Sequence, residues 1–549
     1  MKKNQLVLFF LIFCLSFGLR FYQLGNVPSG FNLDEASQGY NAFSLIMTGK
    51  DRYGEKFPLL FRSFGSYQPP VYTYLTILPT WVFGNKIFTV RFVSALVGSL
   101  LPVLTYLLVQ ASVKDGRKKY TMAIVCSLVV AIAPWSILFS RLAVEANLGL
   151  FLFVCGLTAY LSIKKHKKLR LLLLAVFLGL STNAYYSERV TAVILLGVLL
   201  VYELFRNTNI KLLIIVSAVF VLFQLPHIFL LKSGAFARRF DQVGYMSKTT
   251  YQQSGFWNGK AIGRPVYITR EFITHYLGYW SPNNLFYQID PQLSRSMPGL
   301  SVFYFWMIIP YLLGVSVMLK GIREQFNQLV LFLMVIGPIP AALTSDPFYT
   351  LRALVYMWSL CLAISIGTHY IVRSMTQKII GRFMVLGLLI YSLATFYVSY
   401  FILFKYERAN NYGYAYIKLL DIWNKYKHHE IWIDSARDPG AGVRLAYLKG
   451  FDPMKLQQIL RPQMKTPYYS GEVNMDETYV LDNVSIGAIA WNDELCNSRL
   501  LIGDKIAISD QQVLVHNLTK EVSILDIQGE ELLRGYFTKP NPDKQNCTN

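Results

Sequence analysis

Long apolar runs separated by short basic loops dominate the hydrophobic pattern of the chain. Eleven of these runs approach the length of about 20 residues that a helix needs to cross a bilayer, although several must borrow flanking residues. The predicted spans are Leu6–Leu19, Phe92–Val109, Met122–Phe139, Leu148–Ile163, Leu171–Thr182, Val190–Phe205, Leu212–Leu231, Leu300–Leu319, Leu329–Leu343, Leu351–Val372 and Phe383–Phe404. The pattern predicts a polytopic all-α membrane protein with about eleven transmembrane helices.

Basic residues mark every second loop between these spans. The basic loops are Lys2-Lys3, Lys114 to Lys119, Lys164 to Arg170, Arg206 with Lys211, Lys320 with Arg323, and Arg373 with Lys378 and Arg382. Short loops rich in Lys and Arg remain on the cytoplasmic side, so the N-terminus is predicted to be cytoplasmic and the C-terminus extracytoplasmic. No small-residue cleavage site follows the first span, and we therefore expect a retained helix rather than a cleaved signal peptide.

The predicted outward segments differ in length and character. Two loops are long, at residues 21–88 and 232–299, and long loops in a compact domain are usually functional. The tail alternates strand-like with helix-like runs; these are Glu430–Asp434, Thr478–Leu481, Val522–Asp526 and the helical Asn411–Lys427. The sequence thus predicts a membrane domain at residues 1–404 and an extracytoplasmic α/β domain at residues 405–549.

Composition narrows the possible function classes. Hydrophobic residues make up 53% of the chain and charged residues only 15%, against about 25% charged in soluble domains, which excludes a soluble globule and a disordered chain. The net charge of +21 resides largely in the cytoplasmic loops, so nucleic acid is not expected as a partner. Cys496 and Cys547 lie in the tail without motif spacing, and the sequence leaves their pairing open.

The first long loop contains the strongest candidate chemistry. Asn32 followed three residues later by Glu35 predicts a capping box, with a helix that continues to Met47 and stops at Thr48-Gly49. Asp34 and Glu35 form an acidic pair directly after the first span. The pair either complements the helix dipole or has a function, because an acidic pair at the bilayer boundary is costly unless it is used or paired.

Four arginines fall at predicted outer ends of helices, although Lys and Arg are typically enriched in the cytoplasmic loops. They are Arg91, Arg141, Arg189 and Arg352. Each either supplies fixed positive charge for a bound phosphate or extends toward the membrane interface. Glu145 stands four residues after Arg141. It is either the second acidic residue of a site or an i,i+4 ion-pair partner of that arginine.

These residues belong to motifs that resemble those of a known family. The motifs are Asp34-Glu35, Tyr40–Ala42, Thr48–Asp51, Gly54–Pro58, Tyr67–Tyr74, Phe83–Asn85 followed by Arg91, Ser140–Asn147, Tyr185–Arg189 and Thr350–Leu354. They resemble the membrane-embedded GT-C glycosyltransferases (families 39 and 83), in particular bacterial relatives of the dolichyl-phosphate-mannose protein mannosyltransferases and the lipid A aminoarabinose transferase. The likeness covers roughly residues 1–400 and is most specific in the first loop.

The resemblance implies a function and a location. Such enzymes transfer a sugar, with inversion, from a polyprenyl-phosphate donor to an acceptor hydroxyl on the outer face of the membrane. The catalytic aspartate of the family falls on Asp34, which becomes the expected general base, while Glu35 becomes a helix cap or a ligand of a nearby cation. The implied partners are the lipid-linked donor, membrane lipids and an acceptor protein, polymer or glycolipid, and the implied location is a bacterial inner membrane.

The remaining site expectations concern substrate contacts and metals. Tyr40, Gln68 and Tyr186 are expected to bind substrate. Gln68 stands where the aminoarabinose transferase has Lys, and Ser37 stands where it has Arg, so the resemblance does not fix the donor sugar. The seven histidines lack zinc-ligand spacing. No cofactor is expected to be required, although the acidic pair leaves room for a divalent cation.

Two other function classes fit the same helices and loops. A transporter or lipid flippase with an external accessory domain predicts charged residues at mid-span or broken helices in repeated halves, and the sequence shows neither clearly. A non-catalytic assembly protein that retains the fold is the third class. Assays of sugar transfer by the wild type and by Asp34→Asn test the enzyme and its base, and movement of intact lipid without sugar transfer by the wild type would identify a flippase.

Overall fold

The structure is a computed structural model that describes residues 3–113, 116–257, 260, 262–375, 379–491, 495 and 497–539. Two compact units divide the chain. Unit 1 consists of Met1–Leu24 and Arg91–Phe401, and unit 2 consists of Gly25–Val90 and Ile402–Asn549. Cys496 and Cys547, whose pairing the sequence leaves open, lie outside the described residues.

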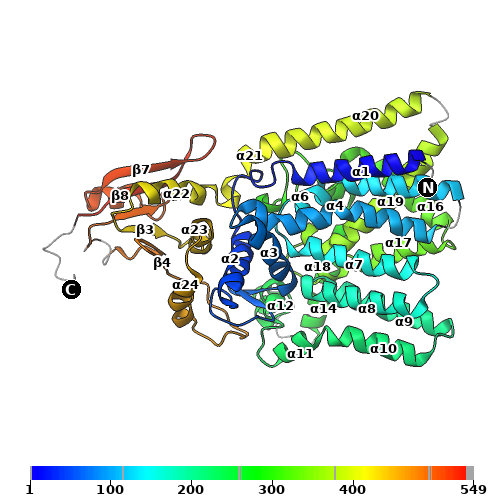
Figure 1. Ribbon diagram of the computed structural model, residues 1–549, viewed down its shortest axis with the longest axis horizontal. Helices are drawn as coiled ribbons and strands as arrows, with labels where there is room; N and C mark the ends of the chain where they lie inside the picture. Colours follow the sequence, from blue (N-terminus) through cyan, green and yellow to red (C-terminus); the bar gives the residue numbers. More distant parts are fainter. Residues whose placement is uncertain are drawn as a thin grey trace. The chain divides into compact units, whose positions relative to one another are not determined.

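Unit 1 is a bundle of helices (Figure 1). Its α-helices are α1 (Lys3–Phe21), α4 (Ile87–Ser112, from Arg91), α5 (Gly116–Ile132), α6 (Pro134–Ser140), α7 (Glu145–Ser162), α8 (Lys167–Ala184), α9 (Glu188–Phe205), α10 (Ile210–Leu222), α11 (Leu225–Leu231), α12 (Arg238–Val243), α13 (Lys248–Gln253), α14 (Gly263–Trp280), α15 (Pro282–Phe286), α16 (Ile308–Lys320), α17 (Gln325–Ile336), α18 (Ile339–Ala342), α19 (Leu354–Met375) and α20 (Ile379–Phe396). Short 3₁₀ helices are η1 (Leu293–Arg295), η2 (Phe305–Met307) and η3 (Thr350–Ala353), and the π-helix η4 (Tyr397–Leu403) follows α20.

Each of the eleven predicted apolar runs falls largely on helical structure, and two of them are bent by more than 40° at a break. The run at 122–139 divides into α5 and α6, which meet at an angle of 58°, and the run at 212–231 divides into α10 and α11, which meet at 55°. A proline occupies the first turn of the second helix in both pairs, Pro134 in α6 and Pro226 in α11. Proline cannot donate the backbone hydrogen bond that would continue the preceding helix, which explains both breaks.

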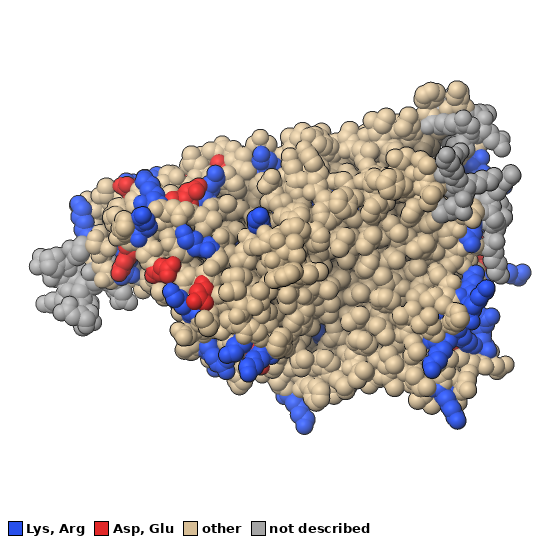
Figure 2. Space-filling view, viewed as in Figure 1, with Lys and Arg blue, Asp and Glu red and all other residues tan. Residues whose placement is uncertain are grey.

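The length and apolar character of its helices indicate that the chain is a multi-pass membrane protein. Among the described residues five helices are long and apolar enough to cross a bilayer, or up to seven if each bent pair forms one span. Figure 2 shows Lys and Arg gathered at the end of the unit 1 bundle where α7 leads into α8 and α9 into α10, with a broad band of other residues along the helices. The expected total of eleven membrane spans, which is larger than this number of five to seven, stays a prediction.

Unit 2 combines the first long loop with the C-terminal residues. The loop contributes α2 (Leu33–Thr48), the hairpin β1 (Phe61–Ser63) and β2 (Ser66–Gln68), and α3 (Pro70–Phe83). The C-terminal part contributes α21 (Phe404–Glu407), η5 (Asn410–Tyr412), α22 (Tyr414–Lys425), β3 (Ile431–Asp434), α23 (Ala441–Lys449), α24 (Pro453–Leu460), η6 (Arg461–Gln463), β4 (Tyr479–Leu481), β5 (Val484–Gly487), β6 (Leu500–Gly503), α26 (Asp510–Val515), β7 (Thr519–Leu525) and β8 (Glu531–Phe537). Helix α2 packs against α3, α23 and α24.

A six-stranded mixed sheet forms the core of the C-terminal part, in the order β4-β5-β3-β6-β8-β7. The central strand β3 pairs in parallel with β5 and β6, with Ile431 opposite Val484 and Leu500, and the outer pairings are antiparallel. Leu501, Ile508 and Tyr536 belong to a buried cluster beside the sheet. The predicted α/β character of the tail is confirmed, including the strands expected at 430–434, 478–481 and 522–526.

Two glycines allow α16 and α19 to pack closely in unit 1. A Cβ on Gly314 would collide with the carbonyl oxygen of Ala363, and a Cβ on Gly367 would collide with that of Pro310. Helices that pack within an apolar solvent rely on such small residues, because only van der Waals contact and hydrogen bonds hold them together.

We therefore expect Gly367→Ala to destabilise the protein by about 1–3 kcal/mol, the usual cost of overpacking. The matched control is Gly197→Ala in α9, where nothing lies within 4 Å of the added Cβ and helix propensity favours alanine. The thermal unfolding midpoint in detergent measures both variants. Equal midpoints for the two variants would contradict the close-packing account.

Candidate functional site

The carboxylate of Asp34 lies in the first turn of α2, whose start is fixed by the predicted capping box. The Asn32 side chain accepts a hydrogen bond from the Asp34 N–H (3.2 Å), and the buried Glu35 carboxylate accepts one from the Asn32 N–H (3.0 Å). Gly49 ends the helix in the left-handed conformation. Glu35 thus caps the helix, while the side chain of Asp34 is exposed.

A chain of hydrogen bonds orients the Asp34 carboxylate. Gln68 Nε2 donates to Asp34 Oδ1 (3.1 Å), and Gln68 Oε1 accepts from the Ser37 hydroxyl (2.9 Å). The Ser37 hydroxyl in turn accepts from Arg52 Nη1 (3.0 Å), and this guanidinium is fully buried. Because an arginine can only donate, all the hydrogen bonds run in one direction, from Arg52 to Ser37, from Ser37 to Gln68, and from the Gln68 NH₂ group to Asp34.

Two further polar side chains of α2 are fully buried. The Tyr40 hydroxyl donates to the Phe451 carbonyl (2.9 Å), and the substrate role expected for Tyr40 remains a prediction. Gln38 lies one turn after Asp34 on the same helical face. Neither amide atom of Gln38 has a hydrogen-bond partner among the described residues. A buried group without a partner costs about 1–3 kcal/mol, which marks Gln38 as a candidate ligand-binding residue.

Asp51 secures the turn that follows α2. Its buried carboxylate accepts hydrogen bonds from the N–H groups of Tyr53 and Glu55 (both 2.9 Å) and from the Tyr468 hydroxyl (2.6 Å). Burial raises the pKa of Asp51 to about 6, against the opposing effect of these hydrogen bonds. The first loop and the segment around Tyr468 therefore share a carboxylate that binds a proton more tightly in the folded state than in the unfolded state.

This raised pKa predicts a pH dependence of stability. The folded state binds the proton more tightly than the unfolded state, so the contribution of Asp51 is most favourable below pH 4. That contribution falls by about 3 kcal/mol as the pH rises through 6. Asp51→Asn should remove this loss, so its thermal midpoint should rise relative to the wild type between pH 4.5 and pH 7.5. Asp421→Asn, at an exposed position of α22, is the control, and parallel pH curves for Asp51→Asn and the wild type would refute the account.

In unit 1 the predicted arginines Arg91 and Arg141 lie with a third, Arg20. Arg141 is within electrostatic range of both other guanidinium groups, and all three are fully buried. Arg141 Nη1 donates to the carbonyls of Leu19 (2.9 Å) and Arg20 (3.1 Å) at the end of α1, and Arg91 Nη1 donates to the Leu24 carbonyl (3.2 Å). The structure thus brings two of the four predicted arginines together.

The other predicted residues of α7 and α9 lie at the starts of those helices. Glu145 is the first residue of α7 and is partly buried. The guanidinium of Arg189 stacks on the ring of Tyr186 (4.4 Å) and on that of Phe236 (4.7 Å). Arg189 Nη2 has no hydrogen-bond partner among the described residues, so Tyr186 and Arg189 form a pair with an unused donor.

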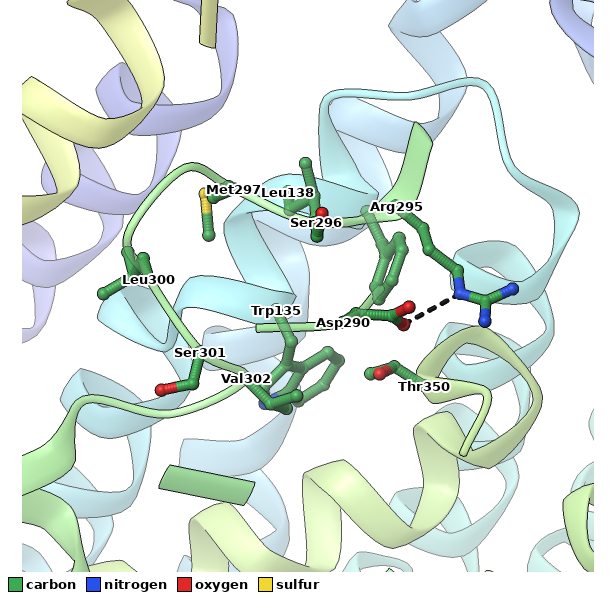
Figure 3. Close-up of a pocket in the computed structure, with 11 residues that line it drawn as sticks. Trp135, Leu138, Asp290, Arg295, Ser296, Met297, Leu300, Ser301, Val302 and Thr350 are labelled. Carbon is green, nitrogen blue, oxygen red and sulfur yellow. Dashed lines mark hydrogen bonds and ion pairs between the residues drawn. The ribbon is translucent and has the colours of Figure 1, made fainter. Parts of the chain in front are cut away.

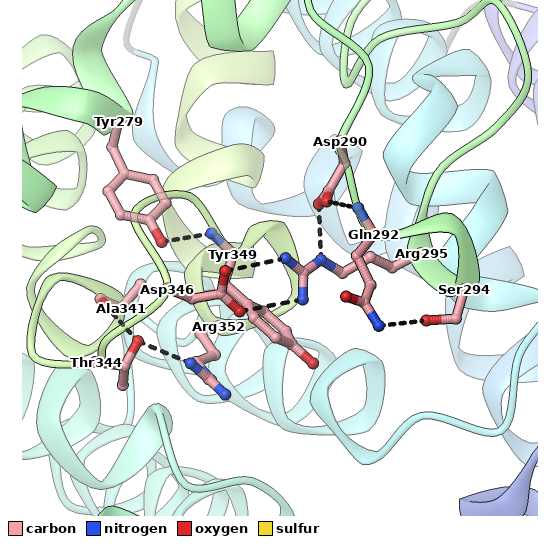
Figure 4. Close-up of polar contacts among 10 residues, drawn as sticks. All are labelled: Tyr279, Asp290, Gln292, Ser294, Arg295, Ala341, Thr344, Asp346, Tyr349 and Arg352. Carbon is pink, nitrogen blue, oxygen red and sulfur yellow. Dashed lines mark hydrogen bonds and ion pairs between the residues drawn. The ribbon is translucent and has the colours of Figure 1, made fainter. Parts of the chain in front are cut away.

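Arg352 belongs to a second cationic cluster, drawn in Figure 4. The Tyr349 ring lies between two guanidinium groups, with that of Arg295 at 3.7 Å and that of Arg352 at 3.9 Å from its centroid. Arg295 binds Asp290 (2.8 Å) and Asp346 (3.4 Å). Burial raises the pKa of Asp290 above its ordinary value, against the opposing effect of Arg295.

The two arginines of this cluster differ in the number of carboxylates that neutralise their charge. Arg352 Nη1 donates to the Thr344 hydroxyl (2.8 Å). No ion pair joins Arg352 to a carboxylate within the described part of the chain, whereas two carboxylates compensate Arg295. Arg352 is therefore the arginine of this cluster without a carboxylate partner among the described residues.

Gln38, Asp290, Arg295 and Tyr349 were not among the site residues predicted from the sequence. The only signal for the last three was an acidic and a basic residue in an otherwise aromatic loop, together with a tyrosine three positions before Arg352. Gln38 carried no signal, because the absence of a partner becomes visible only in three dimensions. The described residues contain no group of three or more His, Cys, Asp or Glu suited to a metal ion, and the expectation that no cofactor is required remains a prediction.

Comparisons with known proteins match part of the chain. Residues 10–239 match the family model described as dolichyl-phosphate-mannose-protein mannosyltransferase. No curated protein matches the sequence as a whole or in part. The matched segment contains Asp34, Glu145 and the arginines at 91, 141 and 189, whereas Arg352 follows it.

Three solved structures are similar to the chain. One is the protein O-mannosyltransferase Pmt1-Pmt2 complex of S. cerevisiae, bound to the sugar donor. The two sequences are 16% identical, the TM-score is 0.32, and the match covers 44% of this chain and 34% of that chain. The oligosaccharyltransferase of Archaeoglobus fulgidus is 14% identical with a TM-score of 0.43, covering 80% and 61%. ArnT from Cupriavidus metallidurans, bound to undecaprenyl phosphate, is 12% identical with a TM-score of 0.44, covering 97% and 98%.

This chain therefore spans only about a third of the first of these relatives and about three fifths of the second. The family match falls on the segment whose motifs predicted it. Over residues 10–239 the chain is similar to the dolichyl-phosphate-mannose-protein mannosyltransferases, which confirms the predicted resemblance to that family over this segment.

Proposed function

We propose that the protein transfers a sugar from a polyprenyl-phosphate donor to an acceptor hydroxyl on the outer face of a bacterial inner membrane, with inversion at the anomeric carbon. One observation carries the proposal. The exposed carboxylate of Asp34, in the segment that matches the family, is oriented by the Gln68 amide at the start of a capped helix. Such a carboxylate is suited to accept a proton from a hydroxyl.

The proposed step uses one carboxylate. The acceptor oxygen forms a bond to the anomeric carbon while the bond from that carbon to the phosphate oxygen breaks, and its electron pair leaves with the polyprenyl phosphate. The hydroxyl proton passes to Asp34. Because a phosphate leaves without being protonated, the reaction needs no second carboxyl group as acid, in contrast to glycoside hydrolysis.

Fixed positive charge stabilises the leaving phosphate in this proposal. Arg352 is the strongest candidate, because it has no carboxylate partner among the described residues and stacks on Tyr349. Arg189, with an unused Nη2 donor, is the second. Preorganised cations lower the barrier because their orientation is already fixed when charge develops. The acceptor is a protein, a polymer or a glycolipid.

Replacing Asp34 tests the proposal. Asp34→Asn removes the proton acceptor while keeping the shape, and the transfer rate should fall by about 100- to 10,000-fold, the usual contribution of a general base. The matched control is Glu35→Gln, because glutamine also completes a capping box. The control should transfer sugar within a few fold of the wild-type rate. The assay uses purified full-length protein with undecaprenyl phosphates carrying single sugars.

Equal rates for Asp34→Asn and the wild type would refute the assigned base. The two bent helix pairs favour one alternative, a transporter or lipid flippase, because broken spans are typical of transport sites. If the wild type moves intact lipid across vesicle membranes and transfers no sugar, the flippase is the correct function.

A second variant tests the phosphate contact. Arg352→Ala should raise the KM for the lipid-linked donor by about 10- to 100-fold, because hydrogen bonds to charged groups contribute about 1.5–3 kcal/mol. Arg206→Ala removes an exposed arginine from the loop between α9 and α10 and serves as the control. An unchanged KM in Arg352→Ala, with the protein folded, would remove Arg352 from the donor site.

A further inference from the structure

A small cavity lined by both polar and apolar side chains lies beside the Arg295–Asp290 ion pair (Figure 3). Its volume is about 20 Å³, and it is not enclosed on all sides. The cavity is lined by Trp135, Leu138, Phe139, Asp290, Arg295, Ser296, Met297, Leu300, Ser301, Val302 and Thr350. Three segments far apart in the sequence therefore build it: α6, the loop from 290 to 302, and the start of η3.

Two hydroxyl groups of this lining are unusual. Ser296 and Thr350 are both more than nine-tenths buried. Neither Ser296 Oγ nor Thr350 Oγ1 has a hydrogen-bond partner among the described residues. A buried hydroxyl without a partner is costly, and two of them around one cavity indicate that a bound group completes their hydrogen bonds.

The lining selects the chemistry of that group. The Asp290 carboxylate disfavours an anion, and the Arg295 guanidinium disfavours a cation. The two hydroxyls both donate and accept, so a neutral group that does the same is the complementary ligand. A volume of about 20 Å³ exceeds the 10–15 Å³ that one water needs, which limits the ligand to a single hydroxyl or one water molecule.

We infer that this cavity receives one hydroxyl group of the donor's sugar. The inference rests on the proposed function and extends it from the phosphate to the sugar. Thr350 precedes the phosphate candidate Arg352 by two residues, and Arg295 both lines the cavity and stacks on Tyr349. A sugar linked to a phosphate at Arg352 therefore begins next to the segment that lines the cavity.

The test measures binding of two kinds of lipid to the purified full-length protein. One is undecaprenyl phosphate, and the other is a panel of undecaprenyl phosphates that carry single pentoses or hexoses. We expect the wild type to bind at least one sugar-bearing lipid more tightly than the bare carrier. The double variant Ser296→Ala/Thr350→Val should lose about tenfold of that affinity and bind the bare carrier unchanged.

Two control variants sharpen the comparison. Thr350→Ser retains the hydroxyl and should retain sugar affinity. Thr158→Val removes another buried hydroxyl without a partner among the described residues, one that does not line the cavity, and should change neither affinity. The thermal midpoint of the double variant should equal that of the wild type.

The remaining outcomes overturn the inference in distinguishable ways. If the double variant loses stability and binds both kinds of lipid as the wild type does, the cavity holds a structural water. If the wild type binds bare and sugar-bearing carriers equally, the cavity does not recognise the sugar, while the role of Asp34 is judged separately by the transfer rate. If the wild type binds none of the lipids, the proposed function fails together with the inference.

Discussion

Polar groups buried among apolar helices must find their partners inside the protein, because hydrocarbon offers none. Arg20 illustrates this constraint in unit 1. Its guanidinium is fully buried and donates to the hydroxyls of Ser16, Ser136 and Ser140 and to the Ala131 carbonyl. Against this background, polar groups without partners are informative. Among the described residues, Arg352 has no carboxylate partner and the hydroxyls of Ser296 and Thr350 have no hydrogen-bond partner, and we expect a ligand to complete these interactions.

The same reasoning applies around Asp34 in unit 2. The Ser37 hydroxyl donates a hydrogen bond to the Gln68 side chain. Together they connect the buried charge of Arg52 to a neutral amide that faces Asp34. The Gln68 amide thus orients the Asp34 carboxylate through a hydrogen bond.

Short sequence patterns predicted the helices and strands. Contacts between residues far apart in the sequence were not predicted. The spacing of Asn32 and Glu35 was enough to predict the start of α2 and its capping box, because these contacts span three residues. The breaks at Pro134 and Pro226 were missed because hydrophobicity alone does not register the loss of a backbone donor. The pairing of Arg295 with the segment around Arg352 depends on how two distant loops meet, which no local pattern encodes.

The central claim is that the anomeric carbon changes partner from a lipid phosphate to an acceptor oxygen. ³¹P NMR of purified wild-type protein, supplied with a sugar-bearing undecaprenyl phosphate and an acceptor, observes this exchange directly. The account predicts that the phosphodiester signal of the donor is replaced by the monoester signal of free undecaprenyl phosphate, in step with a product of inverted anomeric configuration. A phosphodiester signal that persists across the panel of sugars and acceptors would contradict it.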